Sequence, residues 1–445
     1  MKKFLNISLL SLVALSALTL GSCKNEVDEI FDQDAVARLE QAQKEFRQIL
    51  TDQGGKWRME YYANSDEPGY VYLMTFRTDG SVTISGENEW IGHVDGQSLN
   101  VPTYGSEVSL WDVITDNGPV LTFNTYNKYF HVFASPEDIP STDSEAPDET
   151  GYGHEGDYEF DLMKYSNDTL YITGKKYGLD MIMTRVDANV DDHEYMDNVV
   201  AMADSFFNAK IPQVYINLPN GVRWIVKNGA SSILKMFREG DDEISTSEYH
   251  NIIITPDGLS FMNPITLDGY LIKSFVRQAD GSLVCREDNG ITMTADALSN
   301  VFVIQTFVWK ADTAQMGGYY ADQLRQIRSE LNDYEKRKLT AVQISYDTKK
   351  SSYQVVFSCQ KGKNTFNPAF YVTLDQASDN QIKIGFAGET DAAGSLYSEK
   401  SPSMRGFVEH LASGALNLST SSLLAPTDMK LTDSGSSANY TYWKL

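Results

Sequence analysis

Apolar and polar residues alternate in short runs over most of the chain after residue 54. The run Lys-Trp-Arg-Met-Glu-Tyr-Tyr at 56–62 is followed by an aromatic and β-branched run at 70–76, a Thr-Asp-Gly segment at 78–80 and another run at 81–84. Runs of this kind are typical of strands, and Asp-Gly or Asn-Gly pairs between them are typical of hairpin turns. The pattern therefore predicts an antiparallel meander.

The same pattern of strand-like runs and turn residues recurs along the chain and predicts a mainly β protein. We expect antiparallel meander, barrel-like or sandwich units in tandem, with a few short connecting helices. The first unit is assigned to residues 54–188, the second to 189–310, and an α+β unit to 311–445. Further strands of the first unit are expected at 120–133, 158–163, 169–174 and 179–186. In the second unit, turns are expected at the Asn-Gly or Asp-Gly pairs 220–221, 257–258, 268–269 and 280–281.

Apolar residues at helical spacing interrupt these strands. In residues 34–51, Val36, Leu39, Phe46 and Leu50 fit one stripe, and Gly54-Gly55 would stop the helix. The same spacing predicts helices at 191–209, 320–338 and 403–412. The chain ends in Tyr-Trp-Lys-Leu, which is too apolar for a loose tail, so we expect a packed final strand.

The N-terminus has the layout of an export signal. Lys2 and Lys3 precede a mostly apolar run at residues 4–20, which ends in Leu-Gly-Ser-Cys at 20–23. This ending resembles a bacterial lipobox, which implies cleavage before Cys23 and attachment of acyl chains such as palmitate to that residue. Residues 1–22 are therefore predicted to be a lipoprotein signal peptide, with a tether and the first helix at 23–53. An ordinary signal peptide with a chance cysteine is the alternative.

Lipidation and charge together predict where the body of the protein lies. Several acyl chains on one residue anchor a protein stably, so we expect it to be tethered to a membrane without spanning it. The chain carries 61 acidic against 37 basic residues, a net charge of -24. Nucleic-acid binders rely on clustered positive charge, so nucleic acid is not an expected partner.

Several short motifs occur in a fixed order along the chain: Gly55-Lys-Trp57 with Tyr61, the segment 121–127 with His131, the segment 156–160, Gly174-Lys-Lys176 and the segment 253–259. In this order, they resemble a family of Bacteroidetes surface lipoproteins catalogued as a domain of unknown function. The resemblance implies an outer-membrane lipoprotein found beside SusC/SusD-like uptake systems. Its Gly-x-Trp start is also similar to lipocalin-like lipoprotein domains. The resemblance supplies no catalytic residues.

Two groups of residues are candidate sites. Tyr126, Asn127 and His131 mix aromatic and hydrogen-bonding groups near one predicted strand pair, and they would line a ligand pocket or form a structural corner whose polar groups satisfy the backbone. Asp157, Glu159 and Asp161 alternate with apolar residues, which would place three carboxylates on one strand face. Beside an acidic loop at 136–156, they are candidate calcium ligands; a solvated polar face is the alternative.

Other chemistry finds little support in the sequence. The chain has no HExxH, GxSxG or P-loop motif, so a zinc-protease or nucleotide-hydrolase site is not supported and no cofactor is expected apart from calcium. Cys285 and Cys359 lie in apolar, strand-like contexts, which favours two separate buried thiols over a disulfide.

These observations predict a non-catalytic binding or accessory role in the uptake of a glycan or peptide nutrient. The protein would be anchored in the outer membrane and exposed at the cell surface, with a SusC/SusD-like transporter as its partner. A surface hydrolase that uses paired carboxylates is one alternative, and a purely structural subunit of an uptake complex is another.

Overall fold

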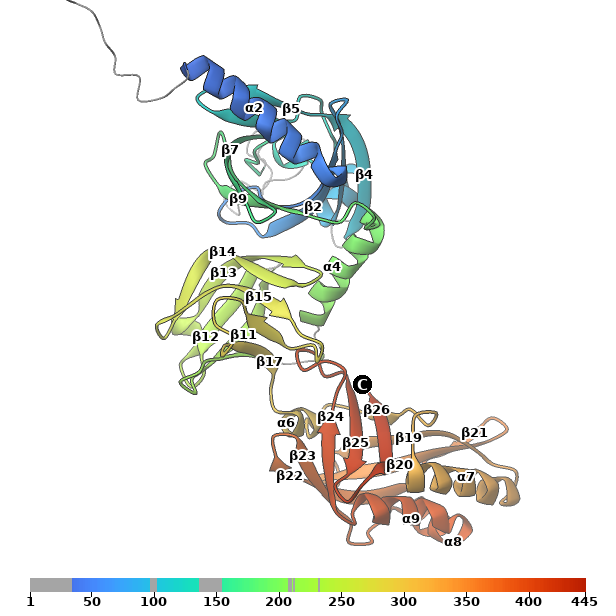
Figure 1. The fold of residues 1–445 in the computed structure, drawn as a ribbon. Helices are drawn as coiled ribbons and strands as arrows, with labels where there is room; N and C mark the ends of the chain where they lie inside the picture. The colour runs from blue at the N-terminus through green and yellow to red at the C-terminus, as the bar shows by residue number, and fades with distance from the viewer. Residues whose placement is uncertain (1–33, 97–101, 136–153, 207–209, 211–212, 231–232) are drawn as a thin grey trace, which may run out of the picture.

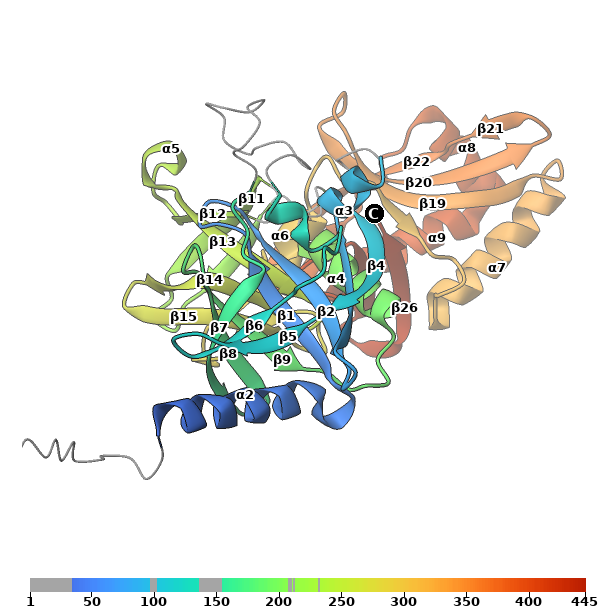
Figure 2. The same ribbon diagram turned by 90° about the horizontal axis from the view of Figure 1, so that it is seen from above.

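The computed structural model describes residues 34–96, 102–135, 154–206, 210, 213–230 and 233–445. Three antiparallel β units follow one another through these residues, and helix α4 (Asp192–Phe206) connects the first to the second (Figures 1 and 2). The predicted fold class, mainly β with a few short helices, is confirmed. The predicted signal peptide and Cys23 lie outside the described residues. Among the helices that the structure describes, none has the length and apolar character needed to cross a bilayer.

The first unit is a nine-stranded sheet that curls back on itself. Its order is β4-β3-β2-β1-β9-β8-β7-β6-β5, so β4 and β5 are the two edges although only Trp111 separates them in sequence. Trp57, Met59 and Tyr61 of β1 are fully buried in its core. The elements are β1 (Lys56–Tyr62), β2 (Gly69–Phe76), β3 (Ser81–Asn88), α3 (Glu89–Val94), β4 (Thr103–Leu110), β5 (Asp112–Thr115), β6 (Pro119–Thr122), β7 (Glu159–Ser166), β8 (Thr169–Gly174) and β9 (Asp180–Arg185).

The predicted first helix is confirmed as α2 (Ala35–Thr51), and Figure 1 shows it lying across one opening of the curled sheet. The last carbonyls of a helix lack partners within the helix. Here the Trp57 indole donates to the Leu50 carbonyl at 2.9 Å, and the Arg185 guanidinium donates to the Ile49 carbonyl at 3.0 Å. A short 3₁₀ turn, η1 (Asp52–Gly54), then leads into β1.

One sequence prediction for the first unit is wrong. The strand expected over 120–133 ends with β6 at Thr122, and residues 131–133 form the 3₁₀ turn η2 (His131–Phe133). Phe123, Phe130 and Phe133 pack inside the curled sheet, which explains the strand-like apolar pattern. The loop expected over 136–156 lies mostly outside the described residues, but His154 and Gly156 are buried rather than solvated.

The second unit is a closed eight-stranded barrel in sequence order. All four predicted turn glycines adopt positive φ angles. The buried Met196 and Met202 of α4 pack into the first and second cores respectively, so this predicted helix joins the two units. The elements are β10 (Val214–Asn217), β11 (Arg223–Ala230), β12 (Ile233–Arg238), α5 (Glu243–Thr246), β13 (Glu248–Thr255), β14 (Gly258–Leu267), β15 (Tyr270–Arg277), β16 (Leu283–Cys285) and β17 (Thr292–Ala295).

The third unit is a nine-stranded sheet in which pairing of β19 with both β18 and β20 closes eight strands into a ring. The final Trp443 is fully buried, as expected, and Cys285 and Cys359 are both buried and free. The strands are β18 (Trp309–Ala311), β19 (Lys338–Asp347), β20 (Ser352–Lys361), β21 (Asn364–Phe366), β22 (Ala369–Ser378), β23 (Gln381–Gly385), β24 (Ala415–Ser419), β25 (Asp428–Asp433) and β26 (Ser436–Lys444).

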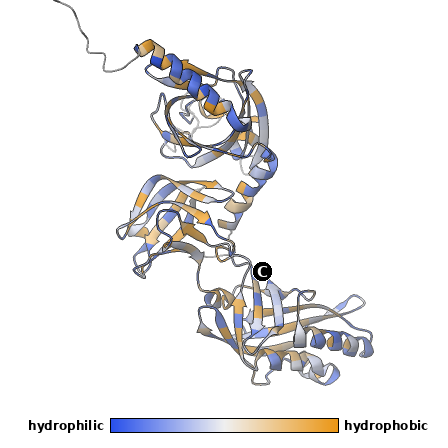
Figure 3. Cartoon of the chain, in the orientation of Figure 1, coloured by the Kyte–Doolittle hydropathy of each residue, from blue (hydrophilic) through white to orange (hydrophobic). Residues whose placement is uncertain are grey.

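Four helices pack with the third sheet. They are α6 (Leu298–Phe302), α7 (Gly318–Asp333), α8 (Ala392–Lys400) and α9 (Pro402–Leu411). The helix predicted over 320–338 ends at Asp333, because Glu335 and Lys336 take positive φ angles and β19 begins at Lys338. Figure 3 shows apolar and polar residues interspersed along the strands and helices of all three units, which agrees with elements that bury one face.

Candidate functional site

The structure places Tyr126, Asn127 and His131 together in a turn rather than beside a strand pair. Asn127 is fully buried, and its Oδ1 accepts hydrogen bonds from the backbone N–H groups of Tyr129 and Phe130, each at 3.2 Å. The Asn127 N–H donates to His131 Nδ1 at 3.1 Å, and burial lowers the pKa of His131. Tyr126 is exposed and its ring centroid lies 5.4 Å from that of His131. Asn127 and His131 therefore act as a structural corner.

The three carboxylates expected on one strand face have different surroundings. Asp157 precedes β7 and is buried, and its two oxygens accept hydrogen bonds from the backbone N–H groups of Lys176 and Tyr177 at 2.9 and 3.0 Å. Glu159 accepts a hydrogen bond from Thr122 at 3.1 Å, and Asp161 is half-buried on β7. Across the part of the chain that the structure describes, no group of three or more His, Cys, Asp or Glu residues is arranged to hold a metal ion.

A different site lies along the contact between the first unit and the barrel. Gly69 at the start of β2 faces Ile253 of β13, whose side chain belongs to the first unit's core. A pocket lies at each end of this contact, which we call the seam. One contains Tyr70 and Ile254, and the other contains Asp66 and Asn251. The seam thus brings together segments that are almost 200 residues apart in sequence.

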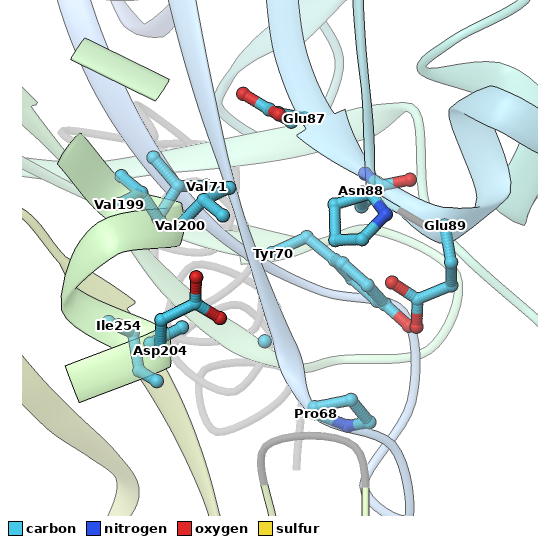
Figure 4. Close-up of a pocket in the computed structure, with 13 residues that line it drawn as sticks. Pro68, Tyr70, Val71, Glu87, Asn88, Glu89, Val199, Val200, Asp204 and Ile254 are labelled. Carbon is cyan, nitrogen blue, oxygen red and sulfur yellow. The ribbon is translucent and has the colours of Figure 1, made fainter. Parts of the chain in front are cut away.

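The pocket with Tyr70 has a volume of about 360 Å³ and is drawn in Figure 4. We call it the carboxylate pocket. One wall, formed by α4, β13 and the start of β2, is largely apolar but includes Asp204. The other wall, from the end of β3 and the start of α3, carries Glu89. The apolar wall consists of Val71, Val199, Val200, Ala203 and Ile254.

Local capping explains how Glu89 reaches this wall. β3 ends at Asn88, a buried residue whose Oδ1 accepts from the Ile91 N–H at 2.9 Å and so caps α3. Asn88 thus marks the junction between β3 and α3, and Glu87 and Glu89 lie on either side of it. The Trp90 indole donates to the Tyr70 hydroxyl at 2.7 Å, which holds α3 against β2.

The carboxylates of this pocket are poorly compensated. Burial raises the pKa of Glu87, and repulsion from Asp197 adds to the effect. Burial also raises the pKa of Glu89, with a further contribution from the nearby Glu67. The Oε2 atom of Glu87 is buried without a hydrogen-bond partner among the described residues. Because a desolvated carboxylate is costly without a partner, the site favours a group that brings positive charge.

A buried pair supports the pocket from behind. His154 Nδ1 lies 2.5 Å from Glu67 Oε2, and Asn64 donates to the other Glu67 oxygen at 2.6 Å. The His154 ring also packs edge-on against Trp90, with centroids 4.5 Å apart. This pair therefore connects the loop before β2 to the start of α3. Its packing fixes the segment that carries Glu89.

Sequence reasoning missed this site. Glu87 and Glu89 flank a helix cap, a pattern that is visible locally, but nothing in the sequence indicates that Asp204, more than a hundred positions later, lies beside them. The chemistry that the pocket offers is attraction of a cation next to an apolar surface. No lysine, arginine or histidine is among its lining residues.

Comparison with known families gives one match. A family model described as Domain of unknown function (DUF4302) matches residues 27–279, which include the first unit, α4 and most of the barrel. The seam and both of its pockets lie inside the matched region. A search of the curated proteins finds no match. The predicted resemblance to a family of unknown function is borne out, while its Bacteroidetes origin and transporter association stay predictions.

Proposed function

Since the chain belongs to the family described as Domain of unknown function (DUF4302), its role has to be inferred from its own residues, and we propose that it is a lipid-anchored binding protein of a nutrient-uptake system. In this proposal, acyl chains on Cys23 hold the protein in the outer membrane of a Bacteroidetes cell, facing outward. The carboxylate pocket binds a nutrient, and a SusC/SusD-like transporter is the partner.

The observation that carries the binding role is the combination of raised carboxyl pKa values and an apolar wall. A ligand with a positive charge would compensate Glu89 and Glu87, and an apolar body would cover the valines of α4. Ligand pockets are usually apolar with a few placed polar groups, which this lining matches. Of the two nutrient classes expected from the sequence, a peptide with a basic residue fits this chemistry better than a neutral glycan.

Binding is tested by isothermal titration calorimetry of the mature, unlipidated protein with benzylamine and with benzyl alcohol, a neutral molecule of similar shape. We expect benzylamine to bind at least about tenfold more tightly, a difference of about 1.4 kcal/mol. Glu89→Gln and Asp204→Asn should each weaken benzylamine binding. Glu40→Gln, on the exposed face of α2, is the matched control and should leave it unchanged. Equal affinities for the amine and the alcohol would refute the cation preference.

Location and partner need a separate experiment in intact cells. Treatment of intact cells with protease should remove the protein from the cell surface. In untreated cells, a pull-down of the full-length protein should recover a channel protein with it. Cys23→Ser should move the protein out of the membrane fraction. An unacylated wild-type product, identified by mass spectrometry, would contradict the anchoring.

A hydrolase is the second candidate, and one observation favours it. Glu89, with its raised pKa, has a second carboxylate, Asp204, on the opposite wall of the same pocket (Figure 4). Two carboxyl groups that face each other across a cleft are the components of acid–base hydrolysis. Turnover of a peptide or glycan panel that is lost in Glu89→Gln would favour this function over binding alone.

A further inference from the structure

The wall of the barrel is split between β13 and β14. The two strands pair from Thr255–Gly258 to Ile252–Phe261, and the pairing ends there. Beyond that point, residues 248–251 pair with β12 and residues 265–267 pair with β15. An irregularity in β14 between Ser260 and Ile265 accounts for the divergence, since a bulge bends its strand away from its neighbour.

The split forms the second pocket of the seam, a groove of about 580 Å³. Its walls are the diverging segments of β13 and β14, and Ser65 and Asp66 of the first unit close one side. Asn251 donates from Nδ2 to the Ser65 carbonyl at 2.5 Å, which fixes this side of the groove. The groove is therefore built from ordered strands and a hydrogen-bonded loop.

The two strand edges differ in what they offer. A strand that lacks a neighbour presents backbone N–H and C=O groups that can pair with another chain. Residues 248–251 of β13 contain no proline, whereas Pro264 on the β14 side has no N–H to donate. β13 is thus the better template. Four residues of strand span about 13 Å, the length of a short extended peptide.

Side chains along this edge of β13 alternate in chemistry. Glu248 and His250 pair in register with Met236 and Leu234 of the barrel core, so they lie on the inner face, and His250 Nε2 is 3.2 Å from Glu248 Oε2. Tyr249 lies on the outer face and is 62 % exposed. Glu248 and Asp66 are the charged acidic residues of the lining, and no lysine or arginine accompanies them.

We propose that the groove binds an extended peptide segment of four to six residues, which adds as a strand to the free edge of β13. Backbone pairing with residues 248–251 supplies affinity, and alternating side chains supply specificity. A basic side chain of the peptide meets Glu248 on the inner face, and an apolar side chain covers the Tyr249 ring on the outer face. This proposal is independent of the carboxylate pocket, which lies at the other end of the seam.

The test uses the mature protein and the probe peptide Ac-Val-Lys-Val-Lys-Val-NH2, with binding measured by calorimetry. A second peptide carries N-methyl groups on alternate backbone amides, which removes strand pairing and keeps every side chain. A third replaces both lysines with glutamate. We expect the first peptide to bind, and the other two to bind at least about tenfold more weakly.

Substitutions distinguish binding of the peptide in this groove from binding in the carboxylate pocket. Glu248→Lys and Tyr249→Ala should each weaken the probe peptide, whereas Glu40→Gln, on the exposed face of α2, should not. If the N-methylated peptide binds the native protein as tightly as the unmodified one, strand addition is wrong. Weakening by Glu89→Gln with no effect of Glu248→Lys would place the peptide in the carboxylate pocket and also overturn the proposal.

Discussion

The substitution Gly69→Ala tests the packing of the seam, because it adds a single carbon atom where the two units meet. A Cβ at this position would lie 2.6 Å from Tyr62 Cε1 and 3.0 Å from both Cβ and Cδ1 of Ile253. Tyr62 and Ile253 are buried, so neither side chain can swing into solvent. Gly69 is outside the left-handed region, so alanine here meets crowding without backbone strain. Gly69→Ala must therefore push β13 away from the first unit or displace the Tyr62 ring.

Two opposing effects set the magnitude. Replacing glycine by alanine restricts the unfolded chain and stabilises the folded state by about 0.4–1 kcal/mol where the conformation allows it. Overpacking a filled core costs about 1–3 kcal/mol. The contact at 2.6 Å with Tyr62 favours the larger value, so we expect a net loss of about 1–2 kcal/mol. The loss should be local to the seam rather than spread over the three units.

Hydrogen exchange followed by mass spectrometry measures this local effect. Backbone amides of residues 69–72 and 252–255 should exchange faster, by roughly tenfold for each 1.4 kcal/mol, while amides in the third unit stay unchanged. Ile253→Val removes the Cδ1 atom that the new methyl would meet. It should therefore recover part of the loss when combined with Gly69→Ala, although alone it costs about 0.5–1.5 kcal/mol.

Gly118→Ala is the matched control, because a Cβ there meets nothing within 4 Å and its φ is also outside the left-handed region. This variant should be neutral or slightly stabilising. If Gly69→Ala exchanges and unfolds like Gly118→Ala, then the seam is not a packed contact. The reasoning that joins the two units through β13 would then be refuted.

Three further substitutions test single groups. Burial raises the folded-state pKa of Glu89, so the folded protein keeps a proton at pH values where the unfolded chain has released it. Stability therefore falls as the pH rises from the unfolded to the folded pKa. Glu89→Gln should raise the free energy of unfolding in urea near about pH 7 and change it little near about pH 3.5. Asn127→Ala should lower stability by about 1–3 kcal/mol in thermal unfolding, because the buried Tyr129 N–H loses its acceptor and the Phe130 N–H keeps only the Asn127 backbone carbonyl. The exposed Tyr126→Ala should stay within about 0.5 kcal/mol. Asp157→Asn should lower the free energy of unfolding by about 1–3 kcal/mol, since an NH2 group would face the backbone N–H of Lys176 or Tyr177. Thermal unfolding of the wild type should be the same in calcium and in chelator. Stabilisation of the wild type by calcium would restore the metal hypothesis.

The parts of the fold that the sequence predicted are those specified by neighbouring residues. The helix at residues 35–51 carries its own apolar stripe, an Asp34 cap and a glycine stop, and the strand at 56–62 matches its predicted bounds. Turn glycines were equally readable, because only a residue without a Cβ accepts those φ angles at no cost. Each of these signals lies within one or two turns of chain.

The errors arose where tertiary packing overrides a local pattern. Phe123, Phe130 and Phe133 have the spacing and aromatic character of a strand, yet they fill the interior of a curled sheet from a turn and a 3₁₀ segment. Similarly, Asp157 matched the alternation of β7 but its carboxylate is committed to two backbone N–H groups outside the strand. Apolar spacing indicates burial more reliably than it indicates secondary structure.

The candidate sites could not be predicted from the sequence, because they depend on where β13 lies in the fold and not on a sequence motif. Within eight residues this strand places Glu248 and Tyr249 in the groove, Ile253 against Gly69, and Ile254 in the carboxylate pocket. It can do so because it leaves β14 after Ile252 and lies against the first unit with its outer face. From the sequence alone, this segment is recognisable only as an Ile-rich strand. Both pockets thus depend on where one strand stops pairing with its neighbour, a property set by the bulge in β14 and by the glycine across the seam.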